Sequence, residues 1–400
     1  MDRLVVVGAS LAGLRAAETA RREGFAGSLV MVGDERHLPY QRPPLSKQIL
    51  MRTLDADQAA LRIDDLDVQW MLGEPARSLD IARREITLEG GGALGFDGLV
   101  IATGTHARKI AGLEPDGSRV HVLRSLDDAA ALTTKLQHAA HVVVVGGGFI
   151  GCEVASACRQ LGVEVTIVEA QSHLLKRAVG PEVGDAIASL HCRNGVDLRL
   201  GAGLRALEHG VKSEQVVLTD GSVLSADLVV LGLGASPATD WLRGSGVDLD
   251  DGVVCDASLR VRGAVGVTAA GDVARWPNGR YGHSMMRLEH WTNASEQGSA
   301  AVHTLLADAA GKAAEPFETV PYFWSDQFGV RVQSVGMPAL ASSYRVIAGS
   351  LASDSFLIEY HDGNELVGVV ALGMQSRILK YRREMNVRPN QHPPILAGQS

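Results

Sequence analysis

Two charged residues, Arg42 and Lys47, stand in the stretch PYQRPPLSK at residues 39–47, on either side of two prolines. Proline fixes one backbone dihedral angle and has no N–H group, so a helix is not expected to begin between Pro43 and Pro44. Lys47 therefore follows a stiff segment, which favours a lysine placed against a bound cofactor. The alternative is an exposed lysine at the start of a helix.

Two glycine-rich turns have the residue spacing of dinucleotide-binding sites. Each follows a run of β-branched residues and precedes an amphipathic segment, so a pyrophosphate could approach the backbone at a helix N-terminus. The second turn has the full G-x-G-x-x-G pattern, whereas the first has serine in the middle. The alternative is a turn whose glycines only relieve crowding between strand and helix. The positions are Gly8, Ser10, Leu11, Ala12 and Gly13 in the first turn, and Gly146, Gly148, Phe149, Ile150 and Gly151 in the second.

Acidic residues end the strand expected after each helix, Asp34 and Glu35 in the first case and Glu169 in the second. A carboxylate at this position accepts a hydrogen bond from a ribose hydroxyl and repels the 2′-phosphate of NADP. The next residues, AQSH at 170–173, contain no arginine, and Arg177 lies several residues further on. The second site is therefore predicted to prefer NAD.

Three short motifs extend the two sites. ATG at 102–104 and GLG at 232–234 end strands of the same type, and VTAAGDVA at 267–274 places an aspartate after a short strand. We expect this carboxylate to reach a ribityl hydroxyl, with the next helix directed at the pyrophosphate; the alternative is a helix-capping aspartate. The residues concerned are Ala102, Thr103, Gly104, Gly234, Gly271 and Asp272.

These motifs occur in the same order at a nearly constant offset, which indicates two copies of one α/β dinucleotide-binding unit. The copies would begin with strands at Leu4–Val7 and Val142–Val145, followed by helices at Leu11–Arg22 and Ile150–Leu161. Two such units in one chain suggest two dinucleotides that exchange electrons, because side chains cannot perform hydride chemistry alone. The added motif around Asp272 assigns a flavin nucleotide to the first copy.

Composition excludes several classes of protein. The 400 residues carry a net charge of -8, which argues against a nucleic-acid binder, and no run of apolar residues is long enough to span a membrane. The chain enters a strand within a few residues of Met1, so a cytoplasmic location is expected. The four cysteines, Cys152, Cys158, Cys192 and Cys255, have no metal-binding spacing and are interpreted as small buried residues.

The full set of motifs resembles the FAD- and NADH-dependent ferredoxin reductases of bacterial oxygenase systems. The order is GxSxxG, RPPLSK, ATG, GGGFIG-x-E, AGD, EHW-x-NA and PYFWSDQ, and it spans essentially the whole chain. The resemblance implies a glutathione-reductase-like α/β fold with two Rossmann-type domains and a C-terminal α/β domain. It places an FAD domain at 1–105 and 232–315, an NAD domain at 106–231, and the last domain at 316–400.

The resemblance also implies the site residues. Expected FAD contacts are Gly8, Ser10, Leu11, Ala12, Gly13, Asp34, Glu35, Arg42, Lys47, Ala76, Ala102, Thr103, Gly104, Arg108, Gly271, Asp272, His290 and Trp291. Expected NAD(H) contacts are Gly146, Gly148, Phe149, Ile150, Gly151, Glu153, Glu169, Arg177 and Gly234.

Lys47, Glu153 and Trp324 are the expected catalytic residues. The resemblance pairs Lys47 with Glu153, which we expect in the first turn of its helix, where the helix dipole favours a carboxylate. A buried lysine would need such a partner. Trp291 and Trp324 are expected near the flavin; the alternative is that both tryptophans only fill the core or a domain interface.

The electron acceptor is expected to be external. Disulfide reductases of this fold keep a redox cysteine pair where this chain has residues 39–50, and that stretch contains no cysteine. The resemblance implies a [2Fe–2S] ferredoxin as partner and a monomer or homodimer. Because ferredoxins are acidic, the segment RILKYRREMNVR at 377–388, with five basic residues and one acidic residue, is a candidate docking site. The alternative is a solvated surface helix.

Two other functions fit the same motifs. One is a rubredoxin reductase or NADH oxidase, which a comparison of electron acceptors would distinguish. The other is an interaction flavoprotein like apoptosis-inducing factor, in which slow turnover with every acceptor is expected.

Overall fold

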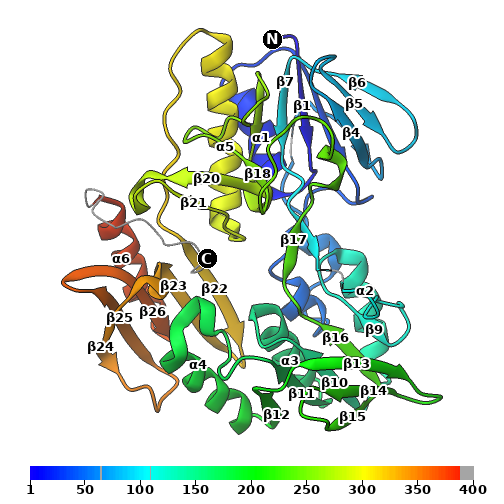
Figure 1. The fold of residues 1–400 in the computed structure, drawn as a ribbon, viewed down its shortest axis with the longest axis vertical. Helices are drawn as coiled ribbons and strands as arrows, with labels where there is room; N and C mark the ends of the chain where they lie inside the picture. The colour runs from blue at the N-terminus through cyan, green and yellow to red at the C-terminus, as the bar shows by residue number, and fades with distance from the viewer. Residues whose placement is uncertain (64, 109, 388–400) are drawn as a thin grey trace.

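The computed structural model describes residues 1–63, 65–108 and 110–387, which form three units, each built on a five-stranded sheet (Figure 1). The first unit lies at the top of Figure 1, and the other two lie below it. This arrangement confirms the predicted α/β fold class. Short helical segments connect the larger elements: Leu45–Ile49, Ala56–Ala59, Asp240–Leu242, Gly271–Val273, Gly279–Tyr281 and Pro338–Leu340.

The first unit is a parallel sheet in the order β19-β7-β1-β2-β3. Its central strand is apolar on both faces, and helices α1 and α5 pack closely against each other beside it (Figure 1). The elements are β1 (Arg3–Val7), α1 (Leu11–Arg22), β2 (Ser28–Gly33), β3 (Gln69–Leu72), β7 (Gly98–Ile101), β19 (Val267–Ala269) and α5 (Trp291–Ala309). Two small sheets flank them, formed by β4 (Ala76–Asp80), β5 (Glu85–Leu88) and β6 (Ala93–Gly95), and by β18 (Val253–Val254), β20 (Ala274–Asn278) and β21 (Ser284–Met286).

The second unit repeats this plan with the strand order β12-β11-β10-β16-β9. A short antiparallel pair, β8 (Thr105–Ala107) with β17 (Ala235–Pro237), joins the two units where the chain passes between them. The elements are β9 (Val120–His121), α2 (Leu126–Leu136), β10 (His141–Val145), α3 (Phe149–Gln160), β11 (Glu164–Glu169), α4 (Lys176–Arg193), β12 (Val196–Leu200) and β16 (Leu228–Leu231). A three-stranded sheet adds β13 (Leu204–His209), β14 (Glu214–Leu218) and β15 (Val223–Ala226).

The internal duplication is visible in the strand pairing. In the first unit β1 lies between β2 and β7, and in the second β10 lies between β11 and β16, all parallel. The first helix has the predicted bounds, whereas α3 begins and ends one residue earlier than expected. After β19, Gly271–Val273 forms a single 3₁₀ turn that leads into strand β20, and the next α-helix is α5, which begins at Trp291. The predicted direction of this helix toward a pyrophosphate stays a prediction.

The third unit is an antiparallel sheet in the order β22-β23-β26-β25-β24, covered by α6. It packs against the second unit, where the Tyr360 hydroxyl donates a hydrogen bond of 2.6 Å to the carbonyl oxygen of Val179. The elements are β22 (Tyr322–Gln327), β23 (Val330–Gly336), β24 (Ser343–Gly349), β25 (Phe356–Asp362), β26 (Glu365–Leu372) and α6 (Gln375–Val387). The predicted domain boundaries themselves stay predictions.

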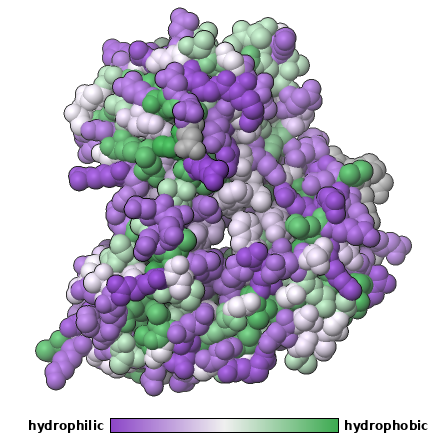
Figure 2. Space-filling model, turned by 180° about the vertical axis from the view of Figure 1, so that it is seen from behind, coloured by the Kyte–Doolittle hydropathy of each residue, from purple (hydrophilic) through white to green (hydrophobic). Residues whose placement is uncertain are grey.

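The surface is largely hydrophilic on the face shown in Figure 2, and it is hollowed between the upper and lower parts of the molecule. No helix within the described residues combines the length and the apolar character that crossing a membrane requires. Cys152, Cys158 and Cys255 are buried as expected, but Cys192 is exposed near the end of α4, so the prediction of four buried cysteines was wrong for that residue.

Candidate active site

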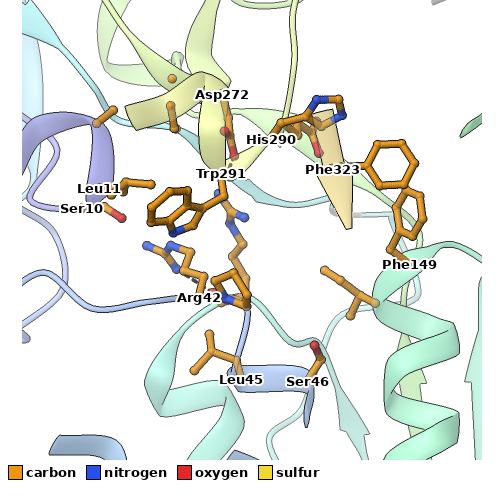
Figure 3. A pocket seen from close by; sticks show the side chains of 18 of the residues that line it. Ser10, Leu11, Arg42, Leu45, Ser46, Phe149, Asp272, His290, Trp291 and Phe323 are labelled. Carbon is orange, nitrogen blue, oxygen red and sulfur yellow. Dashed lines mark hydrogen bonds and ion pairs between the residues drawn. The ribbon is translucent and has the colours of Figure 1, made fainter. Parts of the chain in front are cut away.

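A cavity of about 260 Å³ lies where the three units meet (Figure 3). The N-terminus of α1, the Leu45–Ile49 π-helix, α3, the start of α5 and strand β22 all contribute to its wall. Most of the residues predicted to contact FAD line it: Ser10, Leu11, Ala12, Arg42, Lys47, Ala102, Thr103, Gly104, Gly271, Asp272, His290 and Trp291. Phe149, Ile150, Glu153 and Trp324 line it as well.

Several predicted residues lie outside the lining of this cavity. Among the expected FAD contacts these are Gly8, Gly13, Asp34, Glu35, Ala76 and Arg108, and among the expected NAD contacts Gly146, Gly148, Gly151, Glu169, Arg177 and Gly234. Arg108 and Arg177 are exposed side chains, and the backbone N–H of Arg108 donates to the Gly234 carbonyl oxygen at 3.0 Å. Their predicted contacts stay predictions.

The glycine turns of both units have the same close backbone packing. A Cβ atom on Gly13 would lie 2.0 Å from the carbonyl oxygen of Gly8, and one on Gly151 would lie 2.0 Å from that of Gly146. The middle position is different, because a Cβ on Gly148 would meet nothing within 4 Å. The first unit can therefore carry Ser10 there without a clash.

The N-termini of α1 and α3 fit a bound pyrophosphate. Neither helix has an acidic residue in its first turn, and neither Ser10 nor Gly148 caps the first N–H groups with a side chain. These donors have no intrahelical partner and carry the positive end of the helix dipole. The chain thus presents two places where backbone donors can bind a dinucleotide phosphate.

Arg42 is held in place by the carboxylate that ends β2. Its Nη2 lies 2.6 Å from Glu35 Oε1, and the Tyr40 hydroxyl donates to Glu35 Oε2 at 2.5 Å. The guanidinium also lies over the Tyr40 ring, 5.2 Å from its centre, and donates to the carbonyl oxygen of Arg124. Both Glu35 oxygens are therefore engaged with protein groups, which leaves Arg42 oriented along the cavity wall (Figure 3).

Asp272 faces the cavity from its 3₁₀ turn and pairs with a residue of the linking segment. Arg124 Nη2 lies 3.1 Å from Asp272 Oδ2, while Arg124 Nε donates to the Thr105 carbonyl oxygen at 2.9 Å. This pair joins the first unit to the segment before α2. Asp272 can therefore accept a ligand hydroxyl while its charge stays balanced.

The predicted ion pair between Lys47 and Glu153 is confirmed. Lys47 Nζ lies 2.8 Å from Glu153 Oε2, and both side chains are buried, with 8% and 6% of their surface exposed. The hydroxyls of Ser46 and Ser325 donate to Glu153 Oε2 and Oε1. The expected position of Glu153 in the first helical turn was wrong, because α3 begins at Phe149 and its first turn holds no acidic residue. The lysine and the two hydroxyls, rather than the helix dipole, balance this carboxylate.

Aromatic side chains close the cavity on the side of β22. Phe149 and Phe323 lie side by side with ring centres 4.5 Å apart, and His290 lies 5.4 Å from Phe323 (Figure 3). Trp291 and Trp324 approach edge to face at 6.2 Å. These rings supply an aromatic wall that can pack against a planar cofactor.

Glu169 forms part of the second glycine turn. Its Oε2 accepts a hydrogen bond of 2.6 Å from the Gly147 N–H, and its Oε1 accepts one of 2.7 Å from the Gln171 N–H. The carboxylate thus holds the turn and stands at the end of β11, where it would repel a 2′-phosphate.

No thiol lines the cavity among the described residues. Burial raises the pKa of Cys158 to about 12, and it also raises the pKa of Cys152, so neither thiol is prone to ionise. Cys192 is exposed, and its position in α4 is outside the lining of this cavity.

Sequence reasoning missed several residues of the site: Tyr40, Ser46, Arg124, Phe323 and Ser325. Ser46 and Ser325 stand inside the quoted motifs RPPLSK and PYFWSDQ, so their hydroxyls could have been singled out as partners for a buried charge. Arg124 has no such signal, because only the fold brings the linking segment beside Asp272.

Two histidines, His191 in the interior and the half-buried His290 in the cavity wall, predict a loss of stability in mild acid. Burial lowers the pKa of His191 and of His290 from 6.5 to about 4. The unfolded chain would take up protons near pH 6.5, so the stabilisation is complete above that pH and declines as the pH falls toward 4. Each histidine should contribute up to about 1.4 kcal/mol of lost stability per pH unit in this window.

This expectation is measured as the Tm of the FAD-loaded protein between pH 8 and pH 5. His191→Gln should make the decline shallower, whereas His138→Gln, which changes an exposed histidine, should not. Parallel curves for the parent and His191→Gln would contradict the assignment.

Comparison with known proteins is consistent with this site. Residues 2–298 match the family described as pyridine nucleotide-disulphide oxidoreductase, and residues 322–400 match the family described as reductase C-terminal. The ferredoxin–NAD(+) reductase component of the p-cumate 2,3-dioxygenase system of Pseudomonas putida is 34% identical, over 99% of this chain and 96% of its own length. Rhodocoxin reductase of Rhodococcus erythropolis is 33% identical, over 97% of this chain and 91% of its own.

The fold is also that of a solved relative. The crystal structure of the covalent putidaredoxin reductase–putidaredoxin complex matches with a TM-score of 0.90 and 29% identity, covering 98% of this chain and 94% of that one. The resemblance stated from the sequence motifs is thereby confirmed. The chain belongs to the pyridine nucleotide-disulphide oxidoreductase family and carries that family's nucleotide-binding region together with a reductase C-terminal domain.

Proposed function

We propose that this chain is an NADH:ferredoxin oxidoreductase that uses FAD and supplies electrons, one at a time, to a [2Fe–2S] ferredoxin. That ferredoxin would serve a Rieske oxygenase or a cytochrome P450. The observation that carries the proposal is one cavity lined by both nucleotide-binding units, with the Lys47–Glu153 pair in its wall and no thiol in its lining among the described residues. The names of the relatives support the choice of acceptor.

The residues would divide between the two cofactors as the glycine turns indicate. The α1 turn, Arg42, Asp272 and Trp291 would hold FAD, and the α3 turn and Glu169 would hold NAD(H). Bound FAD supplies chemistry that side chains lack, because it accepts two electrons as a hydride and releases them singly. The domain boundaries proposed from the sequence follow this division: 1–105 with 232–315, then 106–231, then 316–400.

The chain's own residues orient the reactants and control charge. Phe149, Phe323 and Trp324 would help to keep water from a bound cofactor, and the side chain of Lys47 lies in the cavity wall with only 8% of its surface exposed. A fixed cation there favours added negative charge at the cofactor site. The overall reaction converts one NADH and two oxidised ferredoxins into NAD⁺, two reduced ferredoxins and one proton.

Anaerobic stopped-flow reduction by NADH, followed by an acceptor screen, tests this function. Fast flavin bleaching, with ferredoxin preferred over rubredoxin and oxygen, is the expected result. A preference for oxygen would favour an NADH oxidase, and slow turnover with every acceptor would favour an interaction flavoprotein.

Helix α6 is the proposed ferredoxin docking site. Arg377, Lys380 and Arg383 are exposed on it, and Arg388 lies outside the described residues. Arg382 is different, because it lies 2.8 Å from Glu296 and over the Tyr322 ring at 5.1 Å, so its charge is used within the molecule. Arg382 is therefore left out of the charge-reversal test below.

Reversing Arg377, Lys380 and Arg383 to glutamate should raise the KM for ferredoxin about tenfold at low salt and less at high salt. Turnover of ferricyanide with NADH should stay unchanged, because that small acceptor needs no docking surface. Equal loss with both acceptors, or no loss with either, would contradict the docking site.

The cytoplasmic location and the monomeric or homodimeric state remain predictions. Cell fractionation and light scattering of the purified protein test them directly.

A further inference from the structure

A row of buried polar side chains continues from Glu153 away from the cofactor cavity. Ser325, Gln327 and His191 are each completely buried, with 0% of their surface exposed. The Ser325 hydroxyl donates to Glu153 Oε1 at 2.7 Å, Gln327 Nε2 donates to Ser325 Oγ at 3.0 Å, and His191 Nε2 lies 2.9 Å from Gln327 Oε1. Buried polar groups are costly unless they are hydrogen-bonded, and these three side chains meet that need by bonding in a continuous row that ends at Glu153.

All hydrogen bonds in this row run in one direction, because each residue donates to the neighbour that is nearer to Glu153. The Gln327 amide uses its NH₂ group on Ser325, so its oxygen must accept, and His191 must then carry its proton on Nε2. His191 Nδ1 has no partner among the described residues, which agrees with a neutral ring. Hydrogen bonds aligned in one direction strengthen one another and stabilise a negative charge at their end.

The row depends on the regular alternation of strand β22. Residues 323, 325 and 327 lie on one face of the strand, and they meet the cavity, Glu153 and His191 in turn. The end of this strand is also tied to α3, because the Phe328 N–H donates to the Ser156 hydroxyl at 2.7 Å. Strand β22 of the C-terminal sheet therefore contacts the cofactor cavity and helices α3 and α4 of the second unit.

We propose that Ser325 and Gln327 are positioning residues for the Lys47–Glu153 pair, so that the C-terminal unit holds the side chain of Glu153, and with it that of Lys47, in place at the cofactor site. This rests on the proposed function only in that the cavity takes FAD. The C-terminal unit then has a role in the electrostatics of the site in addition to any role in docking. His191 ends the row as a neutral donor.

Other titratable groups surround the pair and must be considered in any test that varies pH. Asp326 and Arg331, joined by contacts of 2.6 and 2.9 Å, line an outer cavity of about 250 Å³ together with Lys47 and Glu153. Glu289 and His290 line the cofactor cavity of about 260 Å³, and the buried thiol of Cys152 is next to Glu153 in the chain. None of these groups donates a hydrogen bond to Glu153 among the described residues, whereas Ser325 does.

The test measures the midpoint potential of bound FAD at several pH values in the purified holoenzyme, together with the rate of flavin reduction by NADH. Ser325→Ala should lower the potential curve and slow the reduction about tenfold, because it removes one of the hydroxyl donors that hold the Lys47–Glu153 pair. Ser325→Thr keeps the hydroxyl and should restore the parent curve. Gln327→Met should give a smaller change, since it leaves Ser325 in place.

Ser334→Ala is the matched control. Ser334 is a buried serine on the neighbouring strand β23, and its hydroxyl has no partner among the described residues. Its curve should superimpose on that of the parent. The proposal is overturned if the curve of Ser325→Ala also superimposes on that of the parent, or if Ser334→Ala shifts the potential as far as Ser325→Ala does.

Failure of the proposed function gives a different result. In that case the parent holoenzyme would fail the acceptor screen with ferredoxin, while the potential curves of the Ser325 variants would still report on Glu153. The two hypotheses are therefore judged by separate measurements.

Discussion

Replacing Lys47 with alanine is expected to slow the reduction of bound flavin by NADH about 100-fold and to lower the flavin midpoint potential. The substitution removes the cation 2.8 Å from Glu153 and leaves a carboxylate that is 94% buried with only two hydroxyl donors. Loss of a nearby positive charge disfavours the addition of electrons to the flavin. A displacement of the reacting groups by about 1 Å can also slow hydride transfer by about two orders of magnitude. Stopped-flow absorbance and a redox titration measure the two effects.

The same variant should also be destabilised, by about 3–5 kcal/mol, because breaking a buried ion pair strands one charge. The double variant Lys47→Met/Glu153→Gln removes both charges and should recover most of this stability without recovering the rate. Lys312→Ala, which changes an exposed lysine, is the control for losing a positive charge. The account of Lys47 fails if Lys47→Ala leaves both the potential and the reduction rate at parent values.

Adding one methyl group at two positions of the second glycine turn should separate folding from cofactor binding. Gly151→Ala would place its Cβ 2.0 Å from the Gly146 carbonyl oxygen, so the turn must open and stability should fall by about 3 kcal/mol. Gly148→Ala would place its Cβ where nothing lies within 4 Å, so the protein should keep its Tm. Its methyl group would still occupy the approach to the α3 N-terminus, and the KM for NADH should rise about tenfold or more.

The first unit supplies a matched variant for this experiment. Gly13→Ala meets the same clash with the Gly8 carbonyl oxygen and should release FAD, which is measured by the ratio of flavin to protein absorbance after purification. Gly148→Ser would give the second turn the residue that the first already has. If Gly148→Ala destabilised the protein as much as Gly151→Ala, the assignment of the open side to the cofactor would be wrong.

The sequence predicted the parts of this molecule that depend on local patterns. The two α/β units, helix α1 and the burial of the central strands follow from β-branched runs, glycine spacing and helical periodicity. The Lys47–Glu153 pair was implied by the family resemblance, since a separation of more than one hundred residues leaves no local signal. The prediction that all four cysteines are buried was right for three of them, because periodicity alone does not tell which face of α4 is covered at Cys192.

Contacts between units account for what could not be predicted. Arg124 reaches Asp272 only because a linking strand pair turns the chain back toward the first unit. Ser325, Gln327 and His191 come from two units and form a row only when the C-terminal sheet packs on α3 and α4. The strand after Asp272 was not predicted for a related reason, because β20 is formed by tertiary pairing with β18 and β21.

Electrons from NADH are expected to pass through the bound flavin to ferredoxin one at a time, and no cysteine of the protein is expected to accept them. The most direct measurement is an anaerobic reaction of the holoenzyme with limiting NADH and excess [2Fe–2S] ferredoxin, with thiols titrated before and after. The account predicts two reduced ferredoxins per NADH and an unchanged thiol count, and in a separate aerated reaction without ferredoxin it predicts slow NADH consumption. A change in thiol count, or oxygen consumption as fast as ferredoxin reduction, would contradict it.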